Sequence, residues 1–324
     1  MLEKNIIKIS SIYSHNLRES IIFLIIKKIS KKKIVFSKPD SADILFVGPY
    51  NNGILVEKVL KKLKKNNLIN NFLPNLEFLN FKRNYNPIKI YFSEEGYLNN
   101  YNFDENFHIT TLMGIKNKNH LRFPIWKDFI DWTSEGFERD NNCLNGKRFG
   151  KLYSIDKLMK PQGLDFLKKN NKITFITSHL KYPRNIFIEK LKNIFPIEGY
   201  GKIFDNKIKD HNSSNFKKID ILKNNRFNLC PHNILLPGYY DEKIPDSFYA
   251  NTIPITWCDN NVKEDFNPNC FINLNDYIDK NFGELIELMN TKKKLEEFGN
   301  EPLIINKPNL EKEFDFLRSI LEKL

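Results

Sequence analysis

The sequence predicts an α/β protein with two doubly wound, Rossmann-like domains. Short apolar runs alternate with helical patterns in the first half of the chain, and the same alternation resumes after about residue 170. At 324 residues the chain is longer than one ordinary core supports, so two domains of roughly 150 residues each are expected. No internal repeat of fixed period is visible, so the two domains have the same alternation of strands and helices but no repeated sequence.

The first half of the chain has the alternating order of strands and helices that a parallel sheet requires. Its strand-like and helical segments are, in order, 6–9, 17–28 (helical), 34–36, 44–47, 55–63 (helical) and 88–92. Polar, aromatic-rich sequence of weak periodicity follows through residue 119, where we expect binding loops. We therefore predict an N-terminal domain at 1–150, with its junction in the mixed signals between 127 and 167.

The second half repeats this order. Its segments are 173–177, 184–194 (helical), 227–230, 242–250 (helical) and 253–257. They predict a second doubly wound unit at 151–305. In the last segment, 306–324, an apolar helical face is formed by Leu310, Phe314, Leu317 and Leu321, and we expect this helix to dock on the body of the protein.

Charge and cysteine content narrow the class of protein. An excess of 51 Lys and Arg over 39 Asp and Glu gives +12, which suits nucleic acid, a nucleotide-sugar diphosphate or an acidic membrane surface as partner. The four cysteines form no CxxC pair, so neither a zinc ribbon nor a disulfide framework is indicated. The longest apolar run, 21–26, is too short to cross a bilayer. We expect a cytoplasmic protein, or a peripheral one at the inner face of the membrane.

The segment from 226 to 277 has the features of a binding site. A strand is followed by a loop beginning at Asn233, a Gly-Tyr-Tyr-Asp turn, a helix opening with Glu242 and Lys243, and a strand ending at Trp257. Ligands of open α/β sheets bind at the carboxyl ends of strands. Lys243 and the backbone N–H groups at the helix start could hold a diphosphate, and Glu242 could accept hydrogen bonds from sugar hydroxyls. In isolation the same pair is also typical of a solvated helical turn.

These residues resemble the signature of glycosyltransferase family 10, the α-1,3/4-fucosyltransferases, in its bacterial form. The stretch RFNLCPHNILLPGYYDEKIPDSFYANTIPITW, continuing into DFNPNCFIN, is similar to the family's Cys-Phe-Glu-Asn, Gly-Tyr-x-Thr-Glu-Lys, Pro-x-Tyr-Trp-Gly and Asp-Phe-Asn-Pro. Upstream, HLRFPIW resembles Tyr-Leu-Arg-x-Pro-Leu-Tyr/Trp, and SHLKYPRNIFIEKL resembles the family's Ser-Asn-x-(x)-Ala-x-Arg helix start. The similarity therefore extends over most of the chain.

The resemblance implies a GT-B architecture with the active site in the interdomain cleft, the acceptor bound by the N-terminal domain and the donor by the C-terminal one. It implies an inverting transfer of L-fucose from GDP-fucose to a hydroxyl of a glycan, with a GlcNAc- or Glc-containing acceptor in surface polysaccharide or lipopolysaccharide. No metal or other cofactor is implied. We expect no nucleic-acid partner, because RRM, KH and zinc-finger patterns are missing from the sequence.

The resemblance also assigns roles to individual residues. Residues that fall on the family's donor-binding positions are Arg184, for the phosphates, and His232, Asn233, Tyr239, Glu242 and Lys243. The general base falls on Glu94, with Glu95 as the alternative if the register slips by one residue. His232 could touch the donor or complete a buried hydrogen bond, and both roles stay open.

The sequence departs from the family pattern at several of these positions. Pro231 and His232 stand where the family has Phe-Glu, Asp241 where it has Thr, and Thr256 and Cys258 where it has Tyr and Gly. These positions lie near the expected donor pocket. They favour, as alternative, a GT-B transferase that uses another GDP-sugar. A basic nucleic-acid-binding protein is the non-enzyme alternative, suggested by the charge alone.

Overall fold

The computed structural model describes residues 5–12, 17–49, 86–96, 106–140, 143, 146, 150–201, 203–204, 218–278 and 282–324. The chain divides into two units, which are described one at a time. The N-terminal unit comprises 1–110, 115–122 and 310–324, and the C-terminal unit comprises 111–114 and 123–309. The predicted helix at 55–63 lies outside the described residues.

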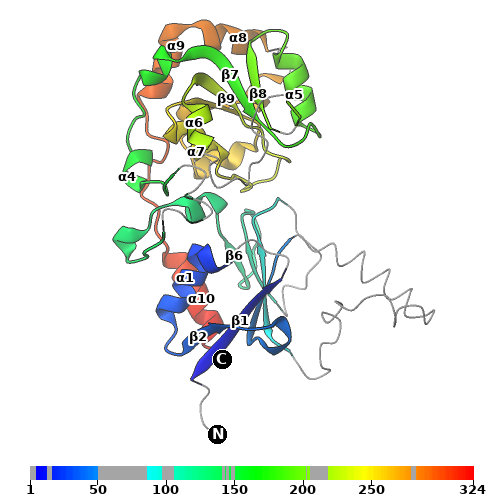
Figure 1. Ribbon diagram of the computed structural model, residues 1–324, viewed down its shortest axis with the longest axis vertical. Coiled ribbons are helices and arrows are strands. Elements are labelled where there is room, and N and C mark those ends of the chain that lie inside the picture. The colour runs from blue at the N-terminus through cyan, green and yellow to red at the C-terminus, as the bar shows by residue number, and fades with distance from the viewer. Residues whose placement is uncertain are drawn as a thin grey trace, which may run out of the picture. The chain divides into compact units, whose positions relative to one another are not determined.

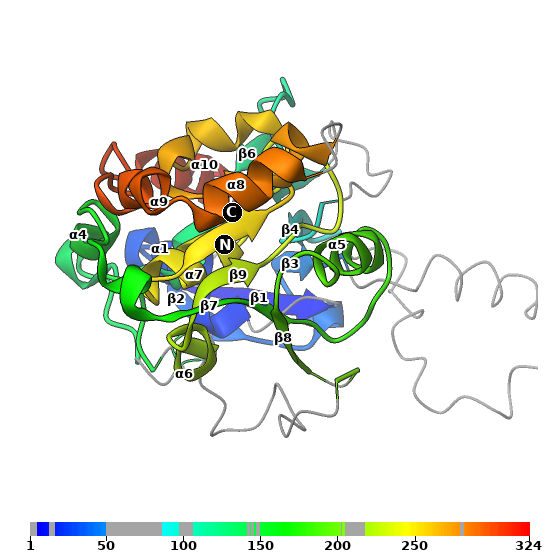
Figure 2. The same cartoon turned by 90° about the horizontal axis from the view of Figure 1, so that it is seen from above.

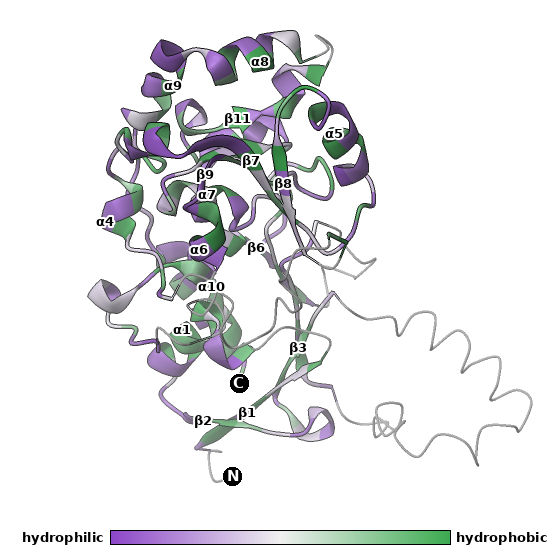
Figure 3. Cartoon of the chain, turned by 45° about the horizontal axis from the view of Figure 1, so that its top comes forward, coloured by the Kyte–Doolittle hydropathy of each residue, from purple (hydrophilic) through white to green (hydrophobic). Residues whose placement is uncertain are grey.

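The N-terminal unit is built on a parallel sheet with the strand order β2-β1-β3-β4-β5-β6 (Figure 1). Its strands are β1 (Ile6–Ile12), β2 (Lys33–Phe36), β3 (Ile44–Val47), β4 (Ile88–Ser93), β5 (Phe107–Thr110) and β6 (His120–Arg122). β3 is buried along its whole length, as expected for a central strand of a parallel sheet with both faces covered, and it is hydrophobic throughout (Figure 3). The four strands predicted for this unit are therefore present.

Among the described residues of the N-terminal unit are two α-helices, one near each end of the chain. Helix α1 (Ile21–Ile29) begins at the cap residue Ser20, whose hydroxyl accepts the N–H of Ile22, and it buries most of its isoleucines. Helix α10 (Glu311–Leu321) packs beside α1 (Figure 1), and Phe316 on it meets Phe107 of β5 edge to face at 5.8 Å. The prediction that the C-terminal segment docks as a helix agrees with this packing.

The C-terminal unit has a second parallel sheet, with the order β11-β10-β9-β7-β8. Figure 2 labels three of these strands, β9, β7 and β8. Its strands are β7 (Asn170–Ile176), β8 (Ile197–Tyr200), β9 (Asn225–Leu229), β10 (Ile253–Thr256) and β11 (Ile272–Asn273). Its helices are α4 (Ile155–Leu158), α5 (Arg184–Leu191), α6 (Lys218–Leu222), α7 (Lys243–Tyr249), α8 (Gly283–Asn290) and α9 (Lys292–Gly299). If the strands of this sheet are numbered by their order in the chain and read across the sheet from β8, their order is 2-1-3-4-5, which is a doubly wound topology.

Short 3-10 helices connect these elements. They lie at Leu17–Glu19, Pro39–Ser41, Ile125–Phe129, Thr133–Glu135, Asp165–Lys168, Asn260–Glu264, Pro268–Cys270 and Leu274–Asp276. None of the helices within the described ranges is long and apolar enough to cross a membrane. All four cysteines are buried free thiols, in agreement with their irregular spacing.

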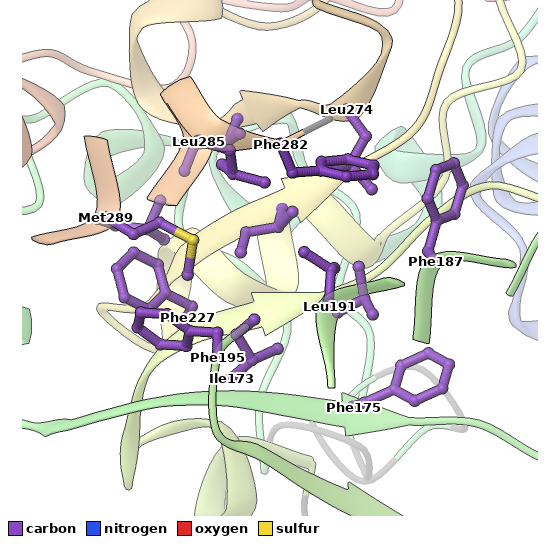
Figure 4. Packing of buried hydrophobic residues seen from close by; sticks show 14 of the residues in the cluster. Ile173, Phe175, Phe187, Leu191, Phe195, Phe227, Leu274, Phe282, Leu285 and Met289 are labelled. Atoms are coloured by element: carbon purple, nitrogen blue, oxygen red, sulfur yellow. The ribbon is translucent and has the colours of Figure 1, made fainter. Parts of the chain in front are cut away.

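The core of the C-terminal unit holds the central strands and α5 together (Figure 4). Phe175 of β7, Phe227 of β9 and Leu191 of α5 are almost completely buried in it, and Phe195 meets Phe227 edge to face at 5.6 Å. Each such side chain contributes about 1.5–3 kcal/mol when it leaves water. Because β7, β9 and α5 share this core, the loops that leave the carboxyl ends of these strands have fixed starting points. Trp257 is buried in the same core.

The boundary between the units falls after Arg122, earlier than the junction at 150 expected from sequence. Residues 123–153 pack within the C-terminal unit, where Tyr153 donates its hydroxyl proton to the carboxylate of Asp246 in α7. Lys218 pairs with the other oxygen of the same buried carboxylate. The sequence around Tyr153 has mixed periodicity and does not reveal that its partner is Asp246, which lies 93 residues further along the chain.

Candidate functional site

The topology of the C-terminal sheet indicates where a ligand binds. The strand order reverses between β7 and β9, and open α/β sheets bind ligands in the crevice at the carboxyl ends of the two strands that flank such a reversal. Arg184 is the first residue of α5, which follows β7, and Asn233 lies in the loop that follows β9. The Arg184 guanidinium donates a 2.7 Å hydrogen bond from Nη2 to Oδ1 of Asn233. Two of the predicted donor-site residues therefore meet at the reversal point.

A histidine that was not predicted to belong to the site supports Arg184 from its other side. Nη1 of Arg184 lies 2.7 Å from Nε2 of His179. Burial lowers the pKa of His179, and the charges of Arg184 and Lys181 lower it further, so the ring is favoured in the neutral form that can accept from the guanidinium. The sequence contains a clue, because His179 precedes Arg184 by five residues in the loop that opens α5.

The Gly-Tyr-Tyr-Asp turn is held by a close backbone approach. Gly238 has φ +91°, and a Cβ there would meet the carbonyl oxygen of Thr111 and, at 2.7 Å, the amide nitrogen of Met113. Met113 donates its N–H to the Pro237 carbonyl at 2.8 Å. Only glycine fits this position, because both the dihedral angle and the available space exclude a side chain. The turn is thereby fixed against residues 111–114 of the same unit.

Tyr239 follows in this turn and is buried, with 4% of its surface exposed. Its hydroxyl accepts a 3.4 Å hydrogen bond from Nδ2 of Asn233. Asn233 thus links Arg184 on one side to Tyr239 on the other. Arg184, Asn233 and Tyr239 form one hydrogen-bonded group, so the structure brings three of the predicted donor-site residues together.

Lys243, another predicted donor-site residue, is held by Asp241. The Lys243 amide N–H donates to Asp241 Oδ1 at 3.0 Å, and the Lys243 ammonium forms an ion pair with Oδ2 of the same carboxylate. Burial raises the pKa of Asp241, but the neighbouring Lys243 and His232 outweigh burial and hold that pKa well below its ordinary value. Burial lowers the pKa of Lys243 while Asp241 and Glu242 raise it, and the balance is a raised pKa. The pair is therefore fully ionised at neutral pH.

His232 lies behind this ion pair and has no exposed surface. Its Nδ1 lies 3.1 Å from Oγ1 of Thr256, and its Nε2 accepts the N–H of Asp241 at 3.2 Å. Of the two roles left open by the sequence, the structure shows His232 completing buried hydrogen bonds. Glu242, at the residue before α7, is half-buried and its side chain does not cap the helix.

The two groups meet at His232 and Tyr239, whose rings lie edge to face with their centroids 5.8 Å apart. The charge of Arg184 is one of the influences that lower the pKa of Lys243. A guanidinium and an ammonium held near each other at the carboxyl ends of β7 and β9 are suited to bind an anion with several oxygens, such as a diphosphate. Among the residues that the structure describes, no group of three His, Cys, Asp or Glu side chains could hold a metal ion.

The predicted base lies in the N-terminal unit. Glu94 and Glu95 directly follow β4, and both are half-buried. Ser93 fixes their loop, because its hydroxyl accepts the N–H of Glu95 and donates to the carbonyl of the same residue, both at 3.2 Å. The donor-site candidates all belong to the C-terminal unit, so an active site that combines both sets of residues stays a prediction, as does the choice of Glu94 over Glu95.

Residues 166–298, which include the reversal point and the Arg184 and Lys243 groups, match the sequence model of the glycosyltransferase family 10 (fucosyltransferase) C-terminal domain. The chain is also similar to a curated protein: an alpha-(1,3)-fucosyltransferase of Helicobacter pylori is 31% identical over 185 residues. That match covers 53% of this chain and 37% of the Helicobacter pylori protein, so it spans little more than a third of the relative's length.

Solved structures of an α1,3-fucosyltransferase share the fold over nearly the whole chain. One of them covers 98% of this chain and 90% of its own, with a TM-score of 0.66 at 22% identity. A structure described as containing GDP-fucose has a TM-score of 0.64 at 21% identity. The predicted fold class, two Rossmann-like α/β domains of GT-B type, is confirmed.

Proposed function

We propose that this protein is an inverting fucosyltransferase that transfers L-fucose from GDP-fucose to a hydroxyl group of a glycan. The observation that carries the proposal is the pair of cations, Arg184 and Lys243, held in a family 10 domain where the sheet order reverses. The relatives' names support fucose as the sugar and GDP as the carrier. The acceptor we propose is a GlcNAc- or Glc-containing surface polysaccharide or lipopolysaccharide, reached in the cytoplasm or at the inner face of the membrane.

In the proposed reaction the acceptor oxygen attacks C1 of fucose while the bond from C1 to the GDP oxygen breaks on the opposite face. Glu94 removes the proton of the attacking hydroxyl, which requires a carboxylate within hydrogen-bond distance in the closed complex. Negative charge grows on the departing diphosphate, where Arg184 binds phosphate oxygens through its planar fork and Lys243 adds a point charge. These two cations can supply the charge stabilisation that a metal ion provides in other transferases, so we propose that none is required.

One observation favours a different GDP-sugar as the donor substrate. His232, Asp241, Thr256 and Cys258 replace the family's residues close to the donor-site group, and a changed pocket could select a different GDP-sugar. This alternative keeps Arg184 and Lys243 in their roles, because the diphosphate is the same.

The test is incubation of the purified protein with GDP-fucose and a glycan array, with products identified by mass spectrometry and linkage analysis. A parallel panel of other GDP-sugars and UDP-sugars serves as the control for donor choice, and each reaction is repeated with EDTA. Transfer of fucose, undiminished by EDTA, is the expected result. Transfer from another GDP-sugar alone would replace fucose in the proposal, and no turnover of any GDP-sugar would contradict it.

A further inference from the structure

The carboxylate of Asp241 holds one residue at two points. Its Oδ1 accepts the backbone N–H of Lys243, and its Oδ2 binds the Lys243 ammonium. The Asp241 side chain is 10% exposed and that of Lys243 is 20% exposed, so the carboxylate belongs to the more deeply buried side chain of the pair. A lysine side chain is otherwise a flexible four-carbon stem with many rotamers. Asp241 therefore selects one position of the ammonium.

Asp241 is held in turn by groups with no exposed surface. Nε2 of His232 lies 3.2 Å from both the backbone nitrogen and the carboxylate Oδ1 of Asp241, so the ring contacts this residue at two points. Nδ1 of the same ring lies 3.1 Å from Oγ1 of Thr256, and this hydroxyl donates to the carbonyl of Cys230 at 3.2 Å. The series of contacts runs from the end of β9 to the ammonium. The imidazole ring is therefore held at both of its nitrogens.

Three departures from the family signature are members of this chain. His232, Asp241 and Thr256 lie on different segments, after β9, in the turn before α7 and at the end of β10, and they are hydrogen-bonded in series. These three residues form one hydrogen-bonded unit, because each of them supplies a donor or an acceptor that its neighbour in the series needs.

We infer that Thr256, His232 and Asp241 form a positioning relay that orients Lys243 toward the diphosphate of the donor. The inference rests on the proposed function, since it needs an anionic ligand at Lys243. An ammonium offers three N–H donors, so Lys243 can bind Asp241 and phosphate oxygens at the same time. The relay residues are positioning residues, because they act on the ligand only through Lys243.

The principal experiment compares Asp241→Asn with Asp259→Asn. Asp259 makes the same local contact, its Oδ1 accepting the N–H of residue Asn261 two positions on at 2.9 Å, so it controls for loss of a carboxylate in an equivalent turn. We expect Asp241→Asn to raise the Kd for GDP, measured by calorimetry, about tenfold to a hundredfold, as for residues that orient a metal ligand. We expect Asp259→Asn to stay within about twofold of the unaltered protein.

A double-mutant cycle separates a relay from a structural role. In a Lys243→Met background, Asp241→Asn has no ammonium left to orient, so it should leave the Kd for GDP where Lys243→Met alone puts it. A merely structural effect on the pocket would persist in that background. If Asp241→Asn fails to fold, Thr256→Val replaces it in the cycle, with Thr256→Ser, which keeps the hydroxyl, expected to retain the affinity.

The outcomes for the relay and for the proposed function differ. If the unaltered protein binds neither GDP nor GDP-fucose, the proposed function fails and the relay with it. If the unaltered protein binds GDP but Asp241→Asn matches Asp259→Asn, or its effect persists beside Lys243→Met, the relay is overturned while the proposed function stands.

Discussion

Arg184 shows how much of a site can depend on a single side chain. It is the first residue of α5, and its planar fork contacts His179 and Asn233 at once, which leaves its orientation defined before any ligand arrives. A lysine at this position would keep the charge but not the fork. At Arg184 the geometry of the side chain therefore matters more than its charge.

For Arg184→Ala we expect kcat/KM for GDP-fucose to fall about 10²- to 10³-fold, as when one donor to a developing oxyanion is lost. Arg184→Lys should fall between that variant and the unaltered enzyme. Arg318→Ala is the control, because it removes the same charge from an exposed ion pair on α10 and should leave turnover unchanged. Equal rates for Arg184→Ala and Arg318→Ala would remove Arg184 from the donor site.

For Glu94→Gln we expect kcat to fall about 10²- to 10⁴-fold, because a general base is lost, while the Kd for GDP stays constant. Glu95→Gln removes the same charge one residue away and is the matched control. Steady-state kinetics and calorimetry measure the two quantities. A large loss of kcat in Glu95→Gln alone would transfer the role of base to Glu95.

Gly238→Ala tests the backbone approach that shapes the donor turn. A positive φ costs a residue with a side chain about 1–3 kcal/mol, and the clash with residues 111–114 adds to this cost. Gly163→Ala is the control, because Gly163 has φ +78° with nothing within 4 Å of a Cβ. We expect Gly238→Ala to lower the thermal midpoint more than Gly163→Ala and to weaken GDP binding as well. Equal midpoints in the two variants would show that the turn has room to yield.

At the scale of secondary structure, the pair of strands β5 and β6 encloses an uncharged histidine. His120 in β6 lies with its Nε2 2.8 Å from Oγ1 of Thr110 in β5. Burial lowers the pKa of His120 to about 4, and the neighbouring His108 contributes to the decrease. Because this pKa lies below that of the unfolded chain, about 6.5, the ring favours folding above pH 6.5 and that stability is lost as the pH falls through 4.

We expect the His120 ring to titrate near pH 4 when followed by nitrogen-15 NMR of the folded protein. In urea all six histidines should titrate near 6.5, which provides the reference for the unfolded chain. In His120→Gln the loss of stability between pH 6.5 and 4 should be smaller than in the unaltered protein. A midpoint near 6.5 in the folded protein would show that the strand pair does not exclude water from the ring.

At the scale of the whole molecule, the chain returns to its first unit at the end. Helix α10 follows the last residues of the C-terminal unit, yet it packs on α1 in the N-terminal unit, with Leu317 and Ile320 buried there. Two segments almost 300 residues apart thus share one core. The N-terminal unit is therefore incomplete without the last fifteen residues of the chain, 310–324.

For Leu317→Ala we expect a loss of about 2–5 kcal/mol in the stability of the N-terminal unit, because a fully buried leucine leaves a cavity. Leu324→Ala, at a position 39% exposed on the same terminal segment, is the control and should have little effect. Hydrogen exchange of the β1 and β3 amides measures the loss locally. Faster exchange confined to the C-terminal unit would contradict the assignment of α10.

Sequence periodicity alone predicted the two sheets, because strands such as β3 and β10 are short, largely apolar runs whose burial is set by local pattern. The motif around Asn233 and Lys243 likewise predicted a donor site, since the spacing of strand, turn and helix is a property of contiguous residues. The unit boundary was not predictable in this way, because contacts such as that of Tyr153 with Asp246 join residues 93 positions apart.

Only the tertiary structure decided that His179 supports Arg184, and that His232, Asp241 and Thr256 form one chain of hydrogen bonds beneath Lys243. In sequence these residues are isolated departures from a pattern. Their meaning depends on which donor faces which acceptor, and that is fixed when the ends of β7, β9 and β10 are aligned in one sheet. Hydrogen bonds act over about 3 Å, a distance that the order of residues along the chain does not specify.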